Sequence, residues 1–166
     1  MQQQADAVAL FEACRRNDTE AVAQMVDADP QLMSYQDVKG FSPVLIAVYN
    51  GAEEAARLLL QKGAPADLPD ASGNTALMGA SFKGYRNLVT ALLAAGVDVN
   101  QRNTQSATAL TFAATFGKMD IAEDLLEHGA AWDIPDSRGK TPIDHAVMQE
   151  NEPMVRLLEK YEQRGR

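Results

Sequence analysis

The chain has 166 residues, of which 46% are hydrophobic and 23% are charged, a composition typical of a folded domain rather than of a disordered segment. Its 15 Lys and Arg residues against 23 Asp and Glu residues give a formal net charge of −8, which argues against nucleic acid and anionic membrane surfaces as partners. One cysteine, Cys14, excludes an intrachain disulfide framework, and the two histidines, His128 and His145, add too few ligands for a Cys/His zinc cluster.

The features that bear on location favour the cytoplasm. No apolar stretch approaches the roughly 18 residues needed to cross a bilayer. Segment 1–6 has neither the basic nor the apolar region of a secretory signal. A lone cysteine also suits a reducing compartment.

Residues of one kind recur every 33 positions through most of the chain, and such a repeat decides the fold. Five columns follow this step: Gly51, Gly84 and Gly117; Gly63, Gly96 and Gly129; Leu59, Leu92, Leu125 and Leu158; Ala47, Ala80, Ala113 and Ala146; and Ser42, Thr75, Thr108 and Thr141. Columns that share one spacing predict a structural unit of 33 residues, repeated in tandem.

In chain order, the first predicted unit covers about residues 5–36. Its segment Leu10–Ala13 matches Leu77–Ala80 with a shift of 67 rather than 66 residues, so one extra residue is placed in segment 27–32, beyond its second helix. The further units are expected at 37–69, 70–102, 103–135 and 136–166. The chain 1–166 is thus predicted to be a single domain whose first and last units diverge, as the capping units of a repeat stack do.

Each predicted unit contains two helices and an extended turn, as the third unit illustrates. Segment 75–84 is expected to be a short helix that Thr75 caps and Gly84 ends. A second helix is expected over 85–95, because the apolar residues at positions 88, 89, 92 and 93 share one face. Neither helix can bury its apolar face alone, so neighbouring units must stack into a solenoid.

The repeated unit resembles the ankyrin repeat, in which a hydroxyl–Pro–aliphatic segment is followed by Ala, Gly, Leu-Leu and Gly-Ala. The segments that carry the likeness are Gly40–Pro43, Gly73–Leu77, Ala107–Leu110 and Gly139–Ile143. The resemblance covers about residues 5–160 and implies an all-α ankyrin-repeat solenoid of five stacked helix–turn–helix–hairpin units. It also implies a general binding scaffold rather than one particular activity.

The last position of the family's tetrapeptide departs from the family pattern. Family members usually carry a histidine there, which links neighbouring units by hydrogen bonds. The residues of this chain at that position are Leu45, Met78, Thr111 and Asp144. We therefore expect apolar packing between units in place of the usual polar network.

The sequence carries no motif for catalysis or for a cofactor: HExxH, CxxC, GxSxG, GxGxxG and Gly-rich phosphate loops are all absent. Cys14 is expected to be a buried structural thiol, since no histidine in its unit could activate it. His128 is expected at the solvated end of a second helix, and His145 is expected to have a structural or surface role. The prediction is a protein without enzymatic activity, cofactor or metal ion; an enzyme with an unrecognised site in the groove is the alternative.

The resemblance implies that the hairpin tips and the last residues of each first helix line a concave groove and vary freely. The candidate partner-binding residues at such positions are Arg15, Arg16, Lys39, Phe41, Tyr49, Asn50, Phe82, Lys83, Thr115, Phe116, Arg138 and Met148. Tyr49, Phe82 and Phe116 are expected to form an exposed row with steps of about 10 Å; packing of these rings onto the core is the alternative. Basic residues at inner positions and acidic residues on second helices predict a groove that is less acidic than the back of the stack.

These features predict a non-catalytic protein–protein interaction module, such as an adaptor, an inhibitor or a regulatory subunit, that binds through its concave face and hairpin tips. Exposed aromatic residues bordered by arginine are typical of interface hot spots. The partner is expected to be a protein with an acidic and apolar surface. A monomer is expected because polar segments end the stack; a self-assembling structural repeat protein is the alternative.

Overall fold

The computed structural model describes residues 1–165, which form helices joined by tight turns and extended hairpin loops. The α-helices are α1 (Gln2–Arg15), α2 (Thr19–Ala28), α3 (Pro43–Tyr49), α4 (Glu53–Gln61), α5 (Ala76–Lys83), α6 (Arg86–Ala94), α7 (Ala109–Thr115), α8 (Met119–Glu127), α9 (Pro142–Met148) and α10 (Glu152–Gly165), and the 3₁₀ helix η1 (Pro30–Ser34) follows α2. This described part of the chain contains no β-strand, which confirms the all-α class. Within it, no helix combines the length and the apolar composition that crossing a membrane requires.

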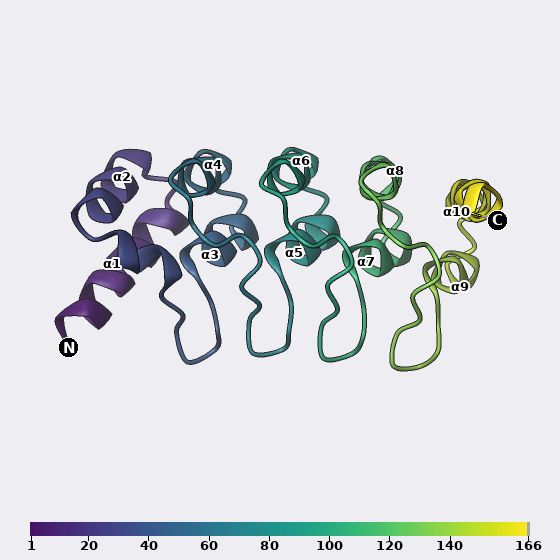
Figure 1. Cartoon of the computed structure of the whole chain (residues 1–166), viewed down its shortest axis with the longest axis horizontal. Helices are drawn as coiled ribbons and strands as arrows, with labels where there is room; N and C mark the ends of the chain where they lie inside the picture. The colour runs from purple at the N-terminus through teal and green to yellow at the C-terminus, as the bar shows by residue number, and fades with distance from the viewer. Residues whose placement is uncertain (166) are drawn as a thin grey trace.

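The helices stand in two rows that run along the length of the molecule (Figure 1). The inner row consists of α1, α3, α5, α7 and α9, and the outer row of α2, α4, α6, α8 and α10 (Figure 1). The hairpin loops project from the inner row, on the side away from the outer row, and the two termini lie at opposite ends (Figure 1). This arrangement is the five-unit solenoid that the 33-residue period predicted.

Hydroxyl side chains determine where the inner helices begin. The Oγ of Ser42 accepts a hydrogen bond from the backbone N–H of Leu45 at 3.2 Å. Thr75, Thr108 and Thr141 cap α5, α7 and α9 in the same way. These bonds satisfy donors that the first turn of a helix leaves free, so the hydroxyl column predicted from the sequence fixes the start of each of these helices.

The core runs between the two rows along the whole stack. The leucine column (Leu59, Leu92, Leu125, Leu158) and the alanine column (Ala47, Ala80, Ala113, Ala146) are at most 1% exposed. Alanine on the inner helices lets them approach closely, while leucine on the outer helices fills the space beneath. Leu45 and Met78 are also buried, which confirms apolar packing at these two positions of the tetrapeptide. Thr111 and Asp144 instead bond to the cap residue of their own helix.

The hairpins supply polar links between units that the sequence did not predict. Asp37, Asp70, Asn103 and Asp136 each accept two backbone N–H bonds of their own turn through one side-chain oxygen, a pattern that Asp and Asn commonly form in turns. Backbone hydrogen bonds of 2.9–3.0 Å then join consecutive tips: Ala71 N–H to Lys39 O, Thr104 N–H to Ser72 O, and Ser137 N–H to Gln105 O. The four hairpins therefore form one continuous hydrogen-bonded ladder.

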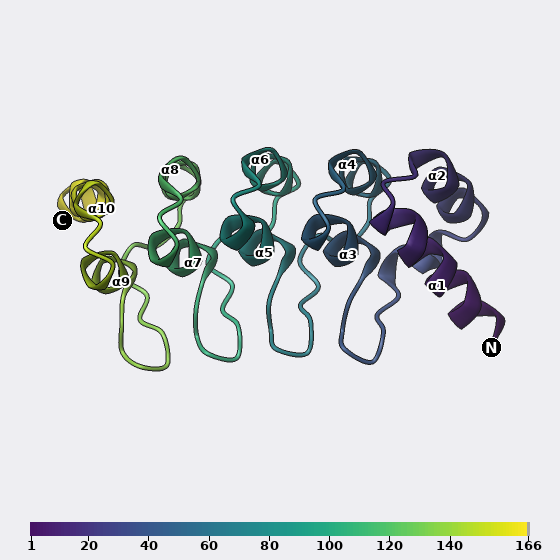
Figure 2. The ribbon, with the colours of Figure 1, turned by 180° about the vertical axis from the view of Figure 1, so that it is seen from behind.

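The first unit departs most from the others. Helix α1 has 14 residues, against 7 in α3, and its first turns run past the inner row toward the side of the hairpins (Figure 2). The 3₁₀ helix η1 lies where the extra residue was predicted, within and just after segment 27–32. It begins where Asp29 Oδ1 accepts a hydrogen bond from the backbone N–H of Gln31 at 3.1 Å.

Candidate functional site

A cleft lies over the middle of α5, between the end of α3 and the first half of α7. Its volume is about 330 Å³. The residues that line it are Tyr49 from α3, Asp70 and Asn74 from the hairpin before α5, Met78, Gly79, Phe82 and Lys83 from α5, and Phe112 from α7. We name it the α5 cleft. Because three consecutive inner helices contribute to it, the cleft exists only in the stacked protein.

One side of the cleft is formed by the ring of Tyr49, which lies directly against Gly79, where a side chain on α5 would collide with it. The ring is half-buried and meets Phe41 edge to face, with centroids 5.7 Å apart. Its hydroxyl donates a hydrogen bond of 3.4 Å to Asp70 Oδ2. Burial, and then the neighbouring Asp70 carboxylate, raise the pKa of Tyr49. The expectation that Tyr49 presents an exposed ring was therefore wrong: Tyr49 and Phe41 pack on each other and on the core.

The other aromatic side chains form a cluster rather than an evenly spaced row. Phe82 and Phe116 are 44% and 48% exposed, as expected for surface residues. Their centroids are 4.8 Å apart at an interplanar angle of 87°, and Phe112 lies 6.4 Å from Phe82. The predicted step of about 10 Å was therefore wrong between Phe82 and Phe116, since the counterpart of Phe82 in the next unit is Thr115 and Phe116 follows it by one position.

Several cations of the inner row and of the hairpins have no carboxylate partner in the part of the chain that the structure describes. Four cations in or just after the helices of the outer row pair with carboxylates: Arg57 with Glu53, Lys62 with Asp27, Arg86 with Asp124, and Arg156 with Glu152. Arg15, at the end of α1, pairs with Glu12. Among residues 1–165, no carboxylate forms an ion pair with Arg16, Lys39, Lys83 or Arg138, and all four are exposed. Their positive charge therefore stays available to a ligand.

The structure brings only some of the candidate residues together. Tyr49, Phe82 and Lys83 line the α5 cleft, Phe41 packs behind Tyr49, and Phe116 packs against Phe82. The five surround one position on the surface, at the centre of the inner row.

The remaining candidates lie elsewhere. Lys39 and Arg138 are in the tips of the first and the last hairpin, and Met148 is exposed on α9. Asn50 and Thr115 use their side chains locally: Asn50 Nδ2 donates to the carbonyl of Ile46 at 2.8 Å, and Thr115 Oγ1 donates to that of Thr111 at 2.7 Å. Both bonds lie in the last turn of a helix and do not identify a contact with a ligand.

Several residues that line the cleft were missed by the sequence reasoning. These are Asp70, Asn74, Met78, Gly79 and Phe112. Gly79 carried a usable signal, since it is the one glycine within the inner helices, where glycine costs about 1 kcal/mol relative to alanine. The others occupy regular positions of the repeat and look structural until the neighbouring units are in place.

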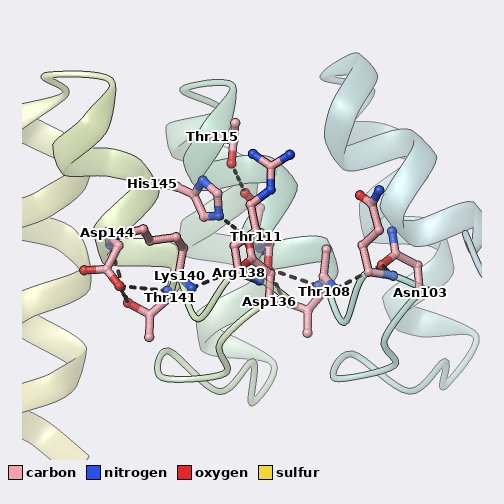
Figure 3. Close-up of polar contacts among 12 residues, drawn as sticks. Asn103, Thr108, Thr111, Thr115, Asp136, Arg138, Lys140, Thr141, Asp144 and His145 are labelled. Atoms are coloured by element: carbon pink, nitrogen blue, oxygen red, sulfur yellow. Dashed lines mark hydrogen bonds and ion pairs between the residues drawn. The ribbon is translucent and has the colours of Figure 1, made fainter.

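Three titratable residues outside the cleft, Cys14, His145 and Asp136, have structural roles. Cys14 is fully buried, and burial raises the pKa of its thiol to about 12, so it is not a nucleophile at neutral pH. His145 Nε2 donates to Asp136 Oδ2 at 2.7 Å and ties α9 to the hairpin before it (Figure 3). Burial acts to raise the pKa of Asp136, but hydrogen bonds from Lys140, His145 and Arg138 outweigh it and lower that pKa.

The contact between Thr141 and Asp144, also drawn in Figure 3, lies within the first turn of α9. The backbone N–H of Thr141 donates to Asp144 Oδ2 at 2.9 Å, and this bond holds the pKa of Asp144 below its usual range. Within residues 1–165, no group of His, Cys, Asp or Glu side chains is arranged to hold a metal ion.

Comparisons with known proteins agree with this architecture. A family model described as ankyrin repeats (3 copies) matches residues 10–103 and 80–164. The chain is 34% identical over 126 residues to a putative ankyrin repeat-containing protein of Treponema pallidum (strain Nichols), and the aligned region covers 74% of this chain and 41% of that protein. It is 35% identical over 134 residues to a putative ankyrin repeat protein of Fowlpox virus (strain NVSL), with 80% and 30% covered.

A third relative is the Caenorhabditis elegans homolog of the transient receptor potential cation channel subfamily A member 1, 26% identical over 153 residues, with 92% of this chain and 13% of that protein covered. The chain thus spans less than half the length of each of these relatives. With a family model that matches nearly all of its residues, the chain belongs to the ankyrin repeat family.

Proposed function

We propose that this protein is a non-catalytic binding module, an adaptor, inhibitor or regulatory subunit, that engages a protein partner through the inner row and the hairpin tips. Ankyrin repeats are in general protein–protein interaction modules and typically lack catalytic activity. The specific surface proposed is the α5 cleft together with the exposed edges of Phe82 and Phe116.

The observation that carries the proposal is the exposed contact between Phe82 and Phe116 beside the unpaired Lys83. The two rings are 44% and 48% exposed, so nearly half of their surface is free to contact a partner. Aromatic side chains that stand in a concavity and are bordered by a cation are the usual anchors of protein interfaces. Binding would bury both rings and place the cation beside a charged group of the partner.

Two further features support a non-catalytic role in the cytoplasm. A catalytic site needs an available acid or base, whereas in the α5 cleft the carboxylate of Asp70 accepts hydrogen bonds from its own hairpin and from Tyr49, and the raised pKa of Tyr49 keeps that hydroxyl protonated. The single thiol is buried, which suits a reducing compartment. We also propose that the free protein is a monomer.

The test is affinity capture from a lysate of the source cells with the tagged chain and with the F82A/F116A double variant. The native chain should retain a partner, and the double variant should retain about tenfold less or lose it. Val147→Ala is the matched control, because Val147 is an exposed aliphatic residue on α9 outside the cleft. Circular dichroism should confirm that all three chains are equally folded.

Equal capture by the native chain and by the folded double variant would exclude this surface. Light scattering on the same samples addresses the structural alternative. An oligomer that depends on Phe82 and Phe116 would show that these rings form a contact between copies of this chain and do not bind a different protein.

A further inference from the structure

We infer that the α5 cleft receives one large apolar side chain of an extended segment of the partner, and that Lys83 pairs with a carboxylate beside that side chain. This inference rests on the proposed function and deepens it by stating the chemistry of the partner.

The shape of the cleft fits an apolar side chain. Gly79 has no Cβ atom, so the ring of Tyr49 lies against the backbone of α5 there, and Phe82 and Phe112 also line the cleft, with their centroids 6.4 Å apart. A volume of about 330 Å³ is at the lower end of the range for ligand sites. Aromatic side chains from three neighbouring helices, together with Met78, favour a large aliphatic or aromatic group over a polar one.

The charges around the cleft predict which kind of residue lies next to that apolar side chain in the partner. Asp70 is already occupied: its Oδ1 accepts the backbone N–H groups of Ser72 and Asn74, each at 2.9 Å, and its Oδ2 accepts the hydroxyl of Tyr49. Lys83 is exposed at the end of α5 and has no carboxylate partner among residues 1–165. The complementary group on a ligand is therefore an Asp or Glu next to the apolar anchor.

The surface beside the cleft indicates a peptide segment rather than a small molecule. Phe82 and Phe116 expose nearly half of their surface, and their contact extends the apolar surface from α5 to the end of α7. A small molecule that filled only the cleft would leave these edges in water. A chain that crosses from α5 to α7 would cover them and hold the anchor and the carboxylate at a fixed spacing.

The experiment selects binders of the full chain from a displayed library of random linear peptides. The enriched sequences should share a large apolar residue with Asp or Glu within one or two positions of it. A labelled synthetic peptide of that consensus should bind about tenfold more weakly to Lys83→Glu and to Phe82→Ala than to the native chain, measured by fluorescence anisotropy. A peptide with Lys in place of the acidic residue should regain binding to Lys83→Glu.

Lys160→Glu is the matched control, because Lys160 is exposed on the outer helix α10 and the change alters the net charge by the same amount. If Lys83→Glu and Lys160→Glu weakened peptide binding equally, the change in net charge alone would explain the loss, and the inference would be overturned. A consensus without an acidic residue, or the absence of any enriched peptide, would also overturn it.

A dimer of the native chain that Phe82→Ala abolishes would assign the cleft to a second copy and also overturn the inference. The capture experiment with F82A/F116A decides the proposed function separately. If capture of a partner depended on these rings but did not change in Lys83→Glu, the proposed function would be supported and the inference about Lys83 would be overturned.

Discussion

At residue 79, α5 has no side chain at the place where the ring of Tyr49 crosses it. The ring reaches this place from the end of α3, one unit earlier, and its hydroxyl reaches the hairpin at Asp70. A glycine within a helix is unfavourable by itself, so its cost is offset here by the packing of the neighbouring tyrosine. The side of the cleft nearest α3 is thus built by two residues that lie 30 positions apart in the chain.

The effect of Gly79→Ala should reverse its sign with the residue at position 49. In the native chain the new methyl group must displace the ring of Tyr49, which should lower the free energy of unfolding by about 1–3 kcal/mol. In a Tyr49→Ala background the ring is absent, and the better helix propensity of alanine should raise the free energy of unfolding by about 0.5–1 kcal/mol. Urea unfolding of the four chains measures both effects. The same sign in both backgrounds would show that the ring does not occupy this place.

The thiol of Cys14 should be almost unreactive in the folded protein. Its pKa is raised from 9.0 to about 12, so its thiolate fraction near pH 8 should be about 10³-fold lower than that of a free cysteine, apart from the steric protection that burial adds. The rate of reaction with a colorimetric disulfide reagent, before and after addition of denaturant, measures this. Rapid reaction of the folded chain would contradict a buried position for Cys14.

Asp136 should stabilise the fold at neutral pH chiefly through the hydrogen bonds of its turn. Asp136→Ala removes two backbone bonds and the bond from His145, and should lower the free energy of unfolding by about 1–3 kcal/mol. Asp136→Asn should cost less, because an amide oxygen can accept the same two backbone bonds, as Asn103 does in the preceding hairpin. Urea unfolding at pH 7 compares the two variants, and equal losses would contradict this account of the turn.

The same residue should give the native chain a pH dependence at the acid end. The folded-state pKa of Asp136 is lowered, so its contribution is fully present above the unfolded pKa of about 3.9 and is lost as the pH falls through the folded pKa. The difference in unfolding free energy between the native chain and Asp136→Asn should therefore shrink below about pH 4. A difference that stays constant with pH would show that ionisation of Asp136 does not matter.

At the scale of elements, the hairpin ladder constrains the turns that have a neighbour. Gly73 and Gly139 occupy the same place in the third and the fifth unit and have φ angles of +77° and +75°. A Cβ at Gly73 would lie 2.9 Å from Asn103 Cα and Thr104 N in the next hairpin, whereas nothing lies within 4 Å of the same point at Gly139. Alanine is strained by its φ at both positions but collides with backbone only at the first.

Gly139→Ala should lower the free energy of unfolding by about 1–2 kcal/mol, the cost of a left-handed conformation. Gly73→Ala should lower it by at least about 1 kcal/mol more, because the two hairpins must separate. Thermal and urea unfolding of the two variants, each compared with the native chain, measure the difference. Equal losses would mean that the tips are not held together in solution.

At the scale of the whole molecule, each unit packs only on its neighbours, so the position of a defect along the stack should decide its reach. Leu92 and Leu158 belong to the same column and are equally buried, but Leu92 lies in the central unit and Leu158 in the last helix. Replacing either by alanine removes the same group and leaves a cavity of similar origin, at a local cost of about 2–5 kcal/mol.

Leu92→Ala should therefore lower hydrogen-exchange protection on both sides of α6. Leu158→Ala should lower it mainly in α9 and α10 and leave α1 to α5 close to native. Hydrogen exchange followed by mass spectrometry on peptides resolves the two patterns. A uniform loss across the chain in both variants would indicate a single cooperative unit rather than a stack with local terms.

The sequence by itself determined the period, the helix starts and the family. These features depend on local chemistry: a hydroxyl caps the helix that follows it, as at Ser42, a glycine such as Gly84 takes the left-handed turn, and an aliphatic residue every 33 positions is buried by an identical neighbour. The burial of Cys14 followed from the same reasoning, since it lies beside a column of small core residues. These features can be predicted because each depends either on residues close in sequence or on the repetition of the unit itself.

Only the tertiary structure decided which aromatic rings are exposed and where the cleft lies. Tyr49 and Phe82 occupy equivalent positions, yet Tyr49 is covered because Phe41 and the bare backbone of Gly79 receive its ring, while Phe82 meets Phe112 and Phe116 and remains half exposed. The direction that a long side chain takes is set by the space that other units leave for it. That space is a property of the stacked units together, and no single 33-residue pattern contains it.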